Sequence, residues 1–429
     1  MPTPAVTWAA PRAAGSLDAT VPVPGSKSLT NRALPLAALA TEPTRLTGAL
    51  SSRDSELMIA ALRALGSQIT TSADGTSIEI VPAPLRGSAS IDCGLAGTVM
   101  RFIPPLAALA DGPVRLDGDA GARLRPMGPI LDGLAALQVP VTCDGQQHRL
   151  PVTVHGRGAI TGGAIEIDAS ASSQFVSGLL LAAPRFDSGL TLRHIGTTLP
   201  SKPHIDMTVA VLRERGVSID DSQAGRWRVE PGPITGGDVL IEPDLSNAGP
   251  FIAAAVAVGG TVRIPHWPAV TTQPGALLPH ILTQMGARAE VRGGVLSVTG
   301  TGTIRPSSLD LGPAGELAPT IAALAALAPG TSTLSGIAHL RGHETDRLAA
   351  LTTEIRRLGG QAEELPDGLR ITGGGLHGGV VHTYHDHRMA TFAAIIGLVV
   401  DGVEVVDIGT TAKTLPHFPA MWSTMLAGA

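Results

Sequence analysis

The chain has 429 residues, of which 44% are hydrophobic and 16% charged, and a formal net charge of −5. Its length exceeds the roughly 250 to 300 residues at which a single hydrophobic core stops growing, so at least two domains are expected, and the apolar content excludes global disorder. The acidic balance and the 3% aromatic content disfavour a nucleic-acid-binding protein.

Sequence features of secretion, disulfide bonding and membrane insertion are missing. The N-terminus has neither a basic n-region nor an apolar h-region. The longest apolar stretches are shorter than the roughly 18 to 20 residues that a membrane span needs. Cys93 and Cys143 are too few for a disulfide framework or a four-thiolate metal site. We therefore expect a cytoplasmic protein that does not insert into membranes.

An amphipathic helical segment with a Leu-x-x-Gly-like turn recurs about every seventy residues along the chain. Its copies, which run on into the next apolar pair, span 56–69, 127–141, 205–219, 276–291, 346–364 and 418–429. The turns fall at Gly66, Val139, Gly216, Gly286, Gly359 and Gly428. A second, Ala-rich series of helices is apolar on nearly all faces, which predicts burial. It spans 31–40, 98–110, 173–183, 247–258, 316–328 and 387–400.

Short β-branched runs between these helices, bounded by Gly, Pro or Asp, predict strands. Examples are 77–81, 152–155, 164–168, 190–194, 261–264 and 403–408. Each repeat therefore has the pattern βαβαββ. Neither a doubly wound sheet nor a (β/α)8 barrel has one fully apolar helix per repeat, so we expect buried helices with outer sheets.

The predicted fold is α/β, a two-lobed inside-out α/β barrel with six repeats, three per lobe. A break near 236–246 separates the third repeat from the fourth. The expected lobes are residues 1–23 with 244–429, and residues 24–243, with the active site in the cleft between them.

Basic residues stand near the start of several predicted helices, where the helix dipole disfavours a positive charge by a few tenths to about 1 kcal/mol each. They include Arg32, Arg101, Arg125, Lys202, Arg347, Arg388 and Lys413. Ser, Thr, Asn and Asp at such positions are explained equally well as helix caps. Cations are not, so a compensating anion is expected at the same helix ends. The sequence predicts a site for small, multiply charged anions.

Two other local patterns are similar to known motifs but do not match them. The segment Gly25-Ser26-Lys27-Ser28 lacks the glycine spacing of a P-loop, which excludes a Walker ATPase. The histidine groups at 339–343 and 382–387 do not match His-Glu-x-x-His, and no metal is expected.

Six motifs spread over all six repeats together resemble the 5-enolpyruvylshikimate-3-phosphate synthase family. They lie at 24–33, 95–101, 169–175, 343–348, 386–390 and 412–414. The resemblance implies two lobes of three βαβαββ units. It also implies transfer of the enolpyruvyl group of phosphoenolpyruvate to the 5-hydroxyl of shikimate-3-phosphate, with release of phosphate. No metal or organic cofactor and no nucleic-acid or membrane partner are implied, and a monomer is expected.

The resemblance assigns roles to individual residues. The catalytic positions are Lys27, Glu316, which takes the hydroxyl proton, and Glu344, which protonates the methylene carbon. The shikimate-3-phosphate positions are Lys27, Ser28, Arg32, Ser172, Ser173, Gln174, Ser201, Glu316, His339 and His343. The phosphoenolpyruvate positions are Lys27, Gly97, Arg125, Gln174, Arg347, Arg388 and Lys413. Supporting positions are Thr98, Arg101 and His387, and Lys202 adds charge beside Ser201.

The chain departs from the family pattern at several of these motifs. The family usually has Asp where Glu316 stands. It commonly has Asn, Pro, Asn, Lys and Tyr where this chain has Leu95, Phe102, His339, His343 and His204. These replacements bear on substrate affinity and inhibitor response.

Two alternative functions follow from similar repeats. A UDP-N-acetylglucosamine enolpyruvyl transferase would carry a reactive Cys near 117–125, where this chain has none. An RNA 3'-phosphate cyclase would need nucleotide-binding features and a basic groove, which the acidic composition disfavours.

Overall fold

The computed structural model describes residues 7–342 and 344–428. The chain divides into two compact units and passes between them twice, from Pro24 to Gly25 and from Ile241 to Glu242. Unit 1 joins the residues up to Pro24 to those from Glu242 onward, and unit 2 is the segment between them. The buried apolar side chains form two separate clusters, one in each unit, so each unit has its own hydrophobic core.

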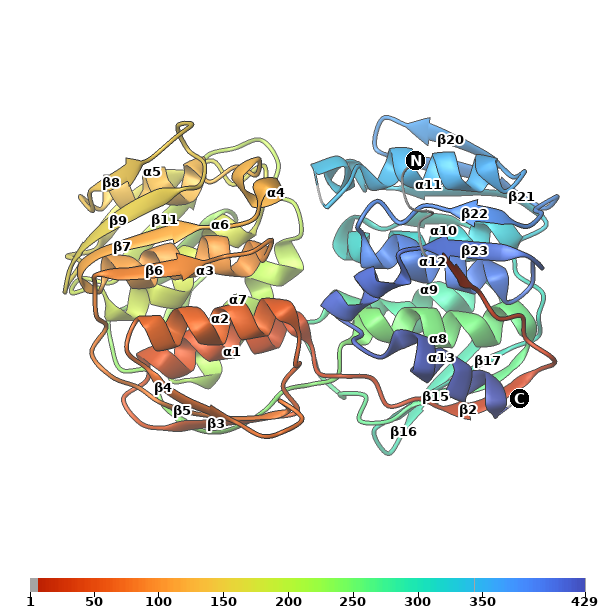
Figure 1. Ribbon diagram of the computed structural model, residues 1–429, viewed down its shortest axis with the longest axis horizontal. Helices are drawn as coiled ribbons and strands as arrows, with labels where there is room; N and C mark the ends of the chain where they lie inside the picture. The colour runs from red at the N-terminus through yellow and green to blue at the C-terminus, as the bar shows by residue number, and fades with distance from the viewer. Residues whose placement is uncertain (1–6, 343, 429) are drawn as a thin grey trace. The chain divides into compact units, whose positions relative to one another are not determined.

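The described part of unit 2 contains three four-stranded sheets (Figure 1). The first contains, in spatial order, β14 (Gly237–Leu240), β3 (Thr44–Thr47), β5 (Ser77–Val81) and β4 (Gln68–Thr71). The second contains β6 (Ala89–Asp92), β7 (Asp111–Asp117), β9 (Val152–Arg157) and β8 (Val141–Cys143). The third contains β10 (Gly163–Ile167), β11 (Leu190–His194), β13 (Arg226–Val229) and β12 (Ile219–Asp220). In each sheet the first pair is parallel and the others are antiparallel.

Unit 1 repeats this arrangement over its described residues, with one strand fewer in its last sheet. Its first sheet contains β2 (Leu17–Thr20), β15 (Gly260–Ile264), β17 (Val295–Gly300) and β16 (Arg288–Arg292). Its second contains β18 (Ser308–Asp310), β19 (Gly330–Ser335), β21 (Gly368–Gly373) and β20 (Gln361–Leu365). Its third contains β22 (Gly379–Val381), β23 (Val403–Val406) and β1 (Thr7–Ala9). The strands β14, β2 and β1 therefore complete sheets whose other strands lie far away in sequence.

The Ala-rich helices form the interior of each unit. In unit 2 the helices α1 (Lys27–Leu39), α3 (Gly97–Ala108) and α6 (Gln174–Ala182) contact one another. In unit 1 the same holds for α8 (Leu245–Val258), α10 (Ala318–Leu327) and α12 (His387–Gly397). Nearly every residue of these helices is buried, because their side chains are apolar on all sides.

The amphipathic helices pack beside the buried ones. They are α2 (Arg53–Ala64), α5 (Gly128–Ala136), α7 (Lys202–Glu214), α9 (Leu278–Gln284), α11 (Arg347–Arg357) and α13 (Phe418–Ala427), with a short α4 (Ala120–Arg123). In unit 2, α2 contacts both α1 and α3, and α5 contacts both α3 and α6. The predicted α/β fold of repeated βαβαββ units, with buried helices and outer sheets, is confirmed. None of the described helices has the length and apolar character that crossing a membrane requires.

One predicted turn is displaced by a residue. The turns after α2, α7, α9 and α11 place a glycine at positive φ, as in Gly66 with φ 111°. In the second repeat the positive φ of 62° belongs to Gln138 and not to Val139. The residue with positive φ stands two positions after the end of the helix in each of these turns, and α5 ends at Ala136. Gly428, in the last repeat, has a φ of −87° and needs no glycine.

Candidate active site

The starts of α11 and α12 bring several predicted site residues together in unit 1. The Asp346 carboxylate accepts hydrogen bonds from two backbone N–H groups and caps α11, which fixes Arg347 in the first turn. Asp386 caps α12 in the same way by accepting from the N–H of Arg388 at 2.9 Å. Acidic caps of this kind satisfy the unpaired N–H groups of a helix start.

Arg347 and Asp386 form a buried ion pair. The Arg347 Nε and Nη2 atoms donate to the two carboxylate oxygens of Asp386 at 2.7 and 3.2 Å, and the side chains are 3% and 0% exposed. Burial opposes ionisation of Asp386, but the Arg347 guanidinium holds the pKa of Asp386 below its ordinary value. The protein itself therefore supplies an anion for this helix-start cation.

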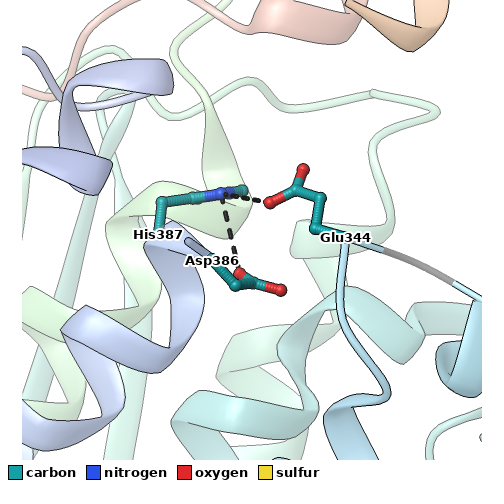
Figure 2. Close-up of side chains that lie close together, drawn as sticks. All are labelled: Glu344, Asp386 and His387. Carbon is teal, nitrogen blue, oxygen red and sulfur yellow. Dashed lines mark hydrogen bonds and ion pairs between the residues drawn. The ribbon is translucent and has the colours of Figure 1, made fainter. Parts of the chain in front are cut away.

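Glu344 lies beside His387 and Asp386, as Figure 2 shows, and also contacts Lys413. One oxygen of Glu344 is 2.5 Å from the Lys413 Nζ atom, at the end of the 3-10 helix η5 (Ile408–Lys413), and the other is 3.2 Å from the His387 Nδ1 atom. Burial opposes ionisation of Glu344, but His387 and Lys413 together hold the pKa of Glu344 well below its usual range. Burial lowers the pKa of His387, and the nearby Glu344 carboxylate works against that shift.

Glu316 has the opposite electrostatic setting. It lies in the 3-10 helix η3 (Gly312–Leu317), just before α10. Burial raises the pKa of Glu316, and the attraction of Arg388 only partly offsets that effect. His339, in η4 (Ala338–Gly342), packs against Gly315, the residue before Glu316. A Cβ on Gly315 would lie 2.6 Å from the His339 Nε2 atom. Burial lowers the pKa of His339.

Arg388 is held by a short chain of hydrogen bonds from the start of α8. Its Nη2 atom donates to the Ser246 hydroxyl at 2.9 Å, and that hydroxyl donates to the Asp244 carboxylate at 2.7 Å. Asp244 is also the N-cap of α8. Three inner helices of unit 1 thus begin beside one another, with Arg388, Glu316 and Ser246 at their starts.

The ligand atoms of Glu344, Asp386 and His387 lie within 4.8 Å of one another, a spacing that could hold a cation. Both carboxylates already carry a protein counter-ion, Lys413 for one and Arg347 for the other. A metal ion there would have to displace or oppose these two positive groups. The two carboxylates are thus balanced by cations of the protein itself.

In unit 2 the predicted residues gather at the starts of α1, α3 and α6. Lys27 lies 3.7 Å from the Asp54 carboxylate, with side chains 20% and 7% exposed. A Cβ on Gly97 would lie 3.0 Å from both the Arg125 Nη2 and the Gln174 Oε1 atoms. The missing side chain at Gly97 therefore allows Arg125 and Gln174 to converge on the first turn of α3.

Arg101, one turn into α3, is 3% exposed. Its guanidinium donates to the carbonyl oxygens of Pro126 at 3.0 Å and Gly97 at 3.4 Å. Burial and the neighbouring Arg125 lower the pKa of Arg101. Within the described residues, the Arg101 Nε and Thr98 Oγ1 atoms are buried without a hydrogen-bond partner. These groups leave excess positive charge and spare donors beside Gly97.

The serine segment, defined as residues 169–173, connects β10 to α6. Ser172 accepts the N–H of Gln174 at 3.2 Å through its hydroxyl, and Ser173 takes the N-cap position. Ser201 begins α7 in the left-handed conformation, with φ 53°. Lys202, next to it, pairs with Asp206 one turn along α7 at 2.6 Å.

Arg32 is buried inside unit 2, at 2% exposure. It donates to the Thr208 hydroxyl at 2.7 Å, to the Ser28 carbonyl at 2.9 Å and to the His204 carbonyl at 2.8 Å. Burial lowers the pKa of Arg32 to about 9. In the structure its guanidinium ties α1 to α7.

His343 lies outside the described residues. The structure adds three partners that the motif analysis did not assign: Asp54 beside Lys27, Asp386 beside Arg347, and Ser246 beside Arg388. Each is a Ser or Asp at or near a helix start, where such residues are common for local reasons. The contact with a distant cation had no local signal.

The fold and these side chains define a two-unit α/β enzyme with cations and buried carboxylates at its helix starts. The family model for EPSP synthase (3-phosphoshikimate 1-carboxyvinyltransferase) matches residues 11–422 of this chain. A 3-phosphoshikimate 1-carboxyvinyltransferase from Kocuria rhizophila is 58% identical and covers 98% of this chain and 96% of its own. The chain belongs to the EPSP synthase family.

The solved structures that it resembles have the same fold. An EPSP synthase structure from Acinetobacter baumannii covers 96% of both chains, with a TM-score of 0.80 and 24% identity. A second structure from that organism has a TM-score of 0.78, also at 24% identity, and covers 96% of this chain and 97% of its own.

Proposed function

We propose that this chain catalyses the reaction of its family, in which the enolpyruvyl group of phosphoenolpyruvate is transferred to the 5-hydroxyl of shikimate-3-phosphate. The product is 5-enolpyruvylshikimate-3-phosphate, and inorganic phosphate leaves. The observation that carries this proposal beyond family membership is the pair Glu316 and Glu344, whose surroundings move their pKa values in opposite directions. The two carboxylates provide the two proton-transfer groups that addition and elimination need, and bound substrate must raise the pKa of Glu344 before it can act as the acid.

Glu316 is the proposed base. Its raised pKa gives the carboxylate a high affinity for the hydroxyl proton, and Arg388 stabilises the ionised form that must accept it. As the proton moves to Glu316, the 5-oxygen forms a bond to C2 of phosphoenolpyruvate. The methylene carbon C3 gains a proton, and a tetrahedral intermediate results.

Glu344 is the proposed donor of the proton to C3. With Lys413 and His387 beside it, Glu344 is ionised in the free protein at neutral pH. We propose that the phosphate of the bound substrate neutralises Lys413, which raises the proton affinity of Glu344 when the acid is needed. In the second half of the reaction Glu344 removes a proton from the new methyl group, the C2–O bond to phosphate breaks, and the enol ether forms.

The remaining positions are proposed ligands of the two substrates. For phosphoenolpyruvate they are Lys27, Gly97, Arg125, Gln174, Arg347, Arg388 and Lys413, with Thr98, Arg101 and His387 in support. For shikimate-3-phosphate they are Lys27, Ser28, Arg32, Ser172, Ser173, Gln174, Ser201, Glu316, His339 and His343. The cations beside Gly97 and around Glu344 support the first group, since a phosphate and a carboxylate both need positive partners.

Both sets draw on residues of both units, so we propose that binding of the two substrates fixes the units relative to each other. Small-angle scattering with and without shikimate-3-phosphate and a phosphoenolpyruvate analogue tests this. An unchanged scattering profile at saturating ligand would contradict it. We also propose that the working form is a cytoplasmic monomer, which light scattering and cell fractionation test.

The decisive experiment for the function is phosphate release with both substrates, compared with each substrate alone. We expect release only with both, and a product heavier than shikimate-3-phosphate by one enolpyruvyl group. Replacing the acceptor with UDP-N-acetylglucosamine is the control for the related transferase. Turnover with that acceptor, and none with shikimate-3-phosphate, would reject the proposal.

A further inference from the structure

The serine segment, residues 169–173, is tied at its beginning by Asp168 and by His194 at the end of β11. Ser173 occupies the N-cap of α6 but makes no side-chain capping bond. The segment is tied instead at its beginning, where Asp168 accepts the Ser170 N–H at 2.9 Å. The second tie comes from β11: the Nδ1 atom of His194 accepts the N–H of Ala169 at 3.1 Å.

His194 reaches the serine segment because β10 and β11 are parallel and in register, with Ile167 opposite His194. The backbone N–H of Ile195 already bonds the carbonyl of Ile167 at 3.0 Å, so the strand pairing is complete without the imidazole. The imidazole adds one bond beyond the ladder, to the first residue of the segment. Ala169 is fully buried, so without this bond its N–H could not turn to water instead.

This hydrogen bond fixes the state of the imidazole. An Nδ1 atom that accepts must be unprotonated, so the proton of the neutral ring is on Nε2. The Nε2 atom is buried and has no hydrogen-bond partner among the described residues. Gly196 closes over the same group: a Cβ there would lie 2.6 Å from the His194 ring and 2.0 Å from the Ser170 hydroxyl.

We propose that His194 is a positioning residue, which sets the serine segment in the conformation that receives the phosphate of shikimate-3-phosphate. The inference rests on the proposed function, because it assumes that Ser172 and Ser173 bind that phosphate. His194 does not touch the substrate in this account. It acts through the Ala169 N–H, and its loss would let the buried amide turn towards another acceptor and displace the serines.

The test compares two substitutions that separate the ring nitrogens. His194→Asn places an amide oxygen near the position of Nδ1 and keeps the bond to Ala169, whereas His194→Gln places it near Nε2 and loses that bond. We expect His194→Gln to raise the KM for shikimate-3-phosphate about 3- to 10-fold, the usual effect of losing one hydrogen bond. The KM for phosphoenolpyruvate and kcat should stay within about twofold, and His194→Asn should resemble the wild type.

Hydrogen exchange of a peptide that covers 165–175 gives a reading independent of turnover. The Ala169 amide should exchange faster in His194→Gln than in His194→Asn. Equal exchange in the two variants, or a wild-type KM for shikimate-3-phosphate in His194→Gln, would overturn the inference. So would equal increases in both KM values, which indicate a general loss of structure. A wild-type protein without phosphate release would instead reject the proposed function.

Discussion

The ammonium group of Lys413 lies 2.5 Å from a carboxylate oxygen of Glu344, although the two residues are 69 positions apart. The contact joins the end of η5 to the segment just before α11. It means that a proposed ligand of phosphoenolpyruvate also controls the charge of the proposed proton donor. Binding of an anion to Lys413 would therefore change the acidity of Glu344.

Glu344→Gln should lower both activity and stability. Removing the acid is expected to cost about 10² to 10⁴ in kcat. The change also leaves Lys413 without its carboxylate, which we expect to lower the free energy of unfolding by about 1 to 2 kcal/mol at pH 7. Arg370→Gln, which breaks the exposed pair between Arg370 on β21 and Glu363 on β20, is a matched control and should alter neither quantity appreciably.

The stability loss in Glu344→Gln should depend on pH with a defined sign. The pKa of Glu344 is lower in the folded than in the unfolded chain, so its contribution is complete above the unfolded pKa, about 4.3. It is lost as the pH falls through the folded pKa. Chemical denaturation between pH 7 and pH 3 should therefore show the wild-type and variant curves converging on acidification. A constant difference would contradict the low pKa.

Glu316→Gln should also reduce kcat by about 10² to 10⁴, but it should make the protein more stable. The pKa of Glu316 is raised by burial, so at neutral pH the folded state carries the cost of a buried ionised carboxylate. A neutral amide removes that cost. The gain should be present at pH 7 and should vanish as the pH falls below the unfolded pKa. Thermal unfolding that showed a lower Tm for Glu316→Gln at pH 7 would show that its ion pairing outweighs its burial.

Lys27→Met is expected to reduce turnover about 10²-fold or more, since it removes a preorganised charge from the proposed transition-state site. The ion pair with Asp54, which is 7% exposed, means that this substitution also affects the fold. The double variant Lys27→Met with Asp54→Asn should recover the stability lost in the single variant and should stay inactive. Recovery of turnover in the double variant would show that Lys27 acts only by neutralising Asp54.

Gly97→Ala should act mainly on phosphoenolpyruvate. The new Cβ would lie 3.0 Å from Arg125 Nη2 and Gln174 Oε1, and flexible side-chain ends would move away from it. We expect the KM for phosphoenolpyruvate to rise about tenfold, the effect of weakening one charged hydrogen bond by roughly 1.4 kcal/mol. Gly232→Ala, where a Cβ would meet no atom within 4 Å, is the control. Equal KM values for the two variants would show that Arg125 does not bind this substrate.

The sequence by itself determined the repeat, the two classes of helix and the cations at helix starts. These features depend on apolar periodicity and on residues a few positions apart, such as Asp346 capping α11 just before Arg347. The same local logic explains the displaced turn at Gln138, since helix ends are the least certain part of a periodic pattern.

Tertiary structure alone decided which strands complete the sheets and which charges meet. Strand β14 pairs with β3, although most of the sequence of unit 2 lies between them. Asp386 at the start of α12 pairs with Arg347 at the start of α11. The opposed pKa shifts of Glu316 and Glu344 have the same origin, because burial and counter-ions come from elements distant in sequence. Folding sets the solvent exposure and the charged neighbours of each glutamate, and these determine its pKa.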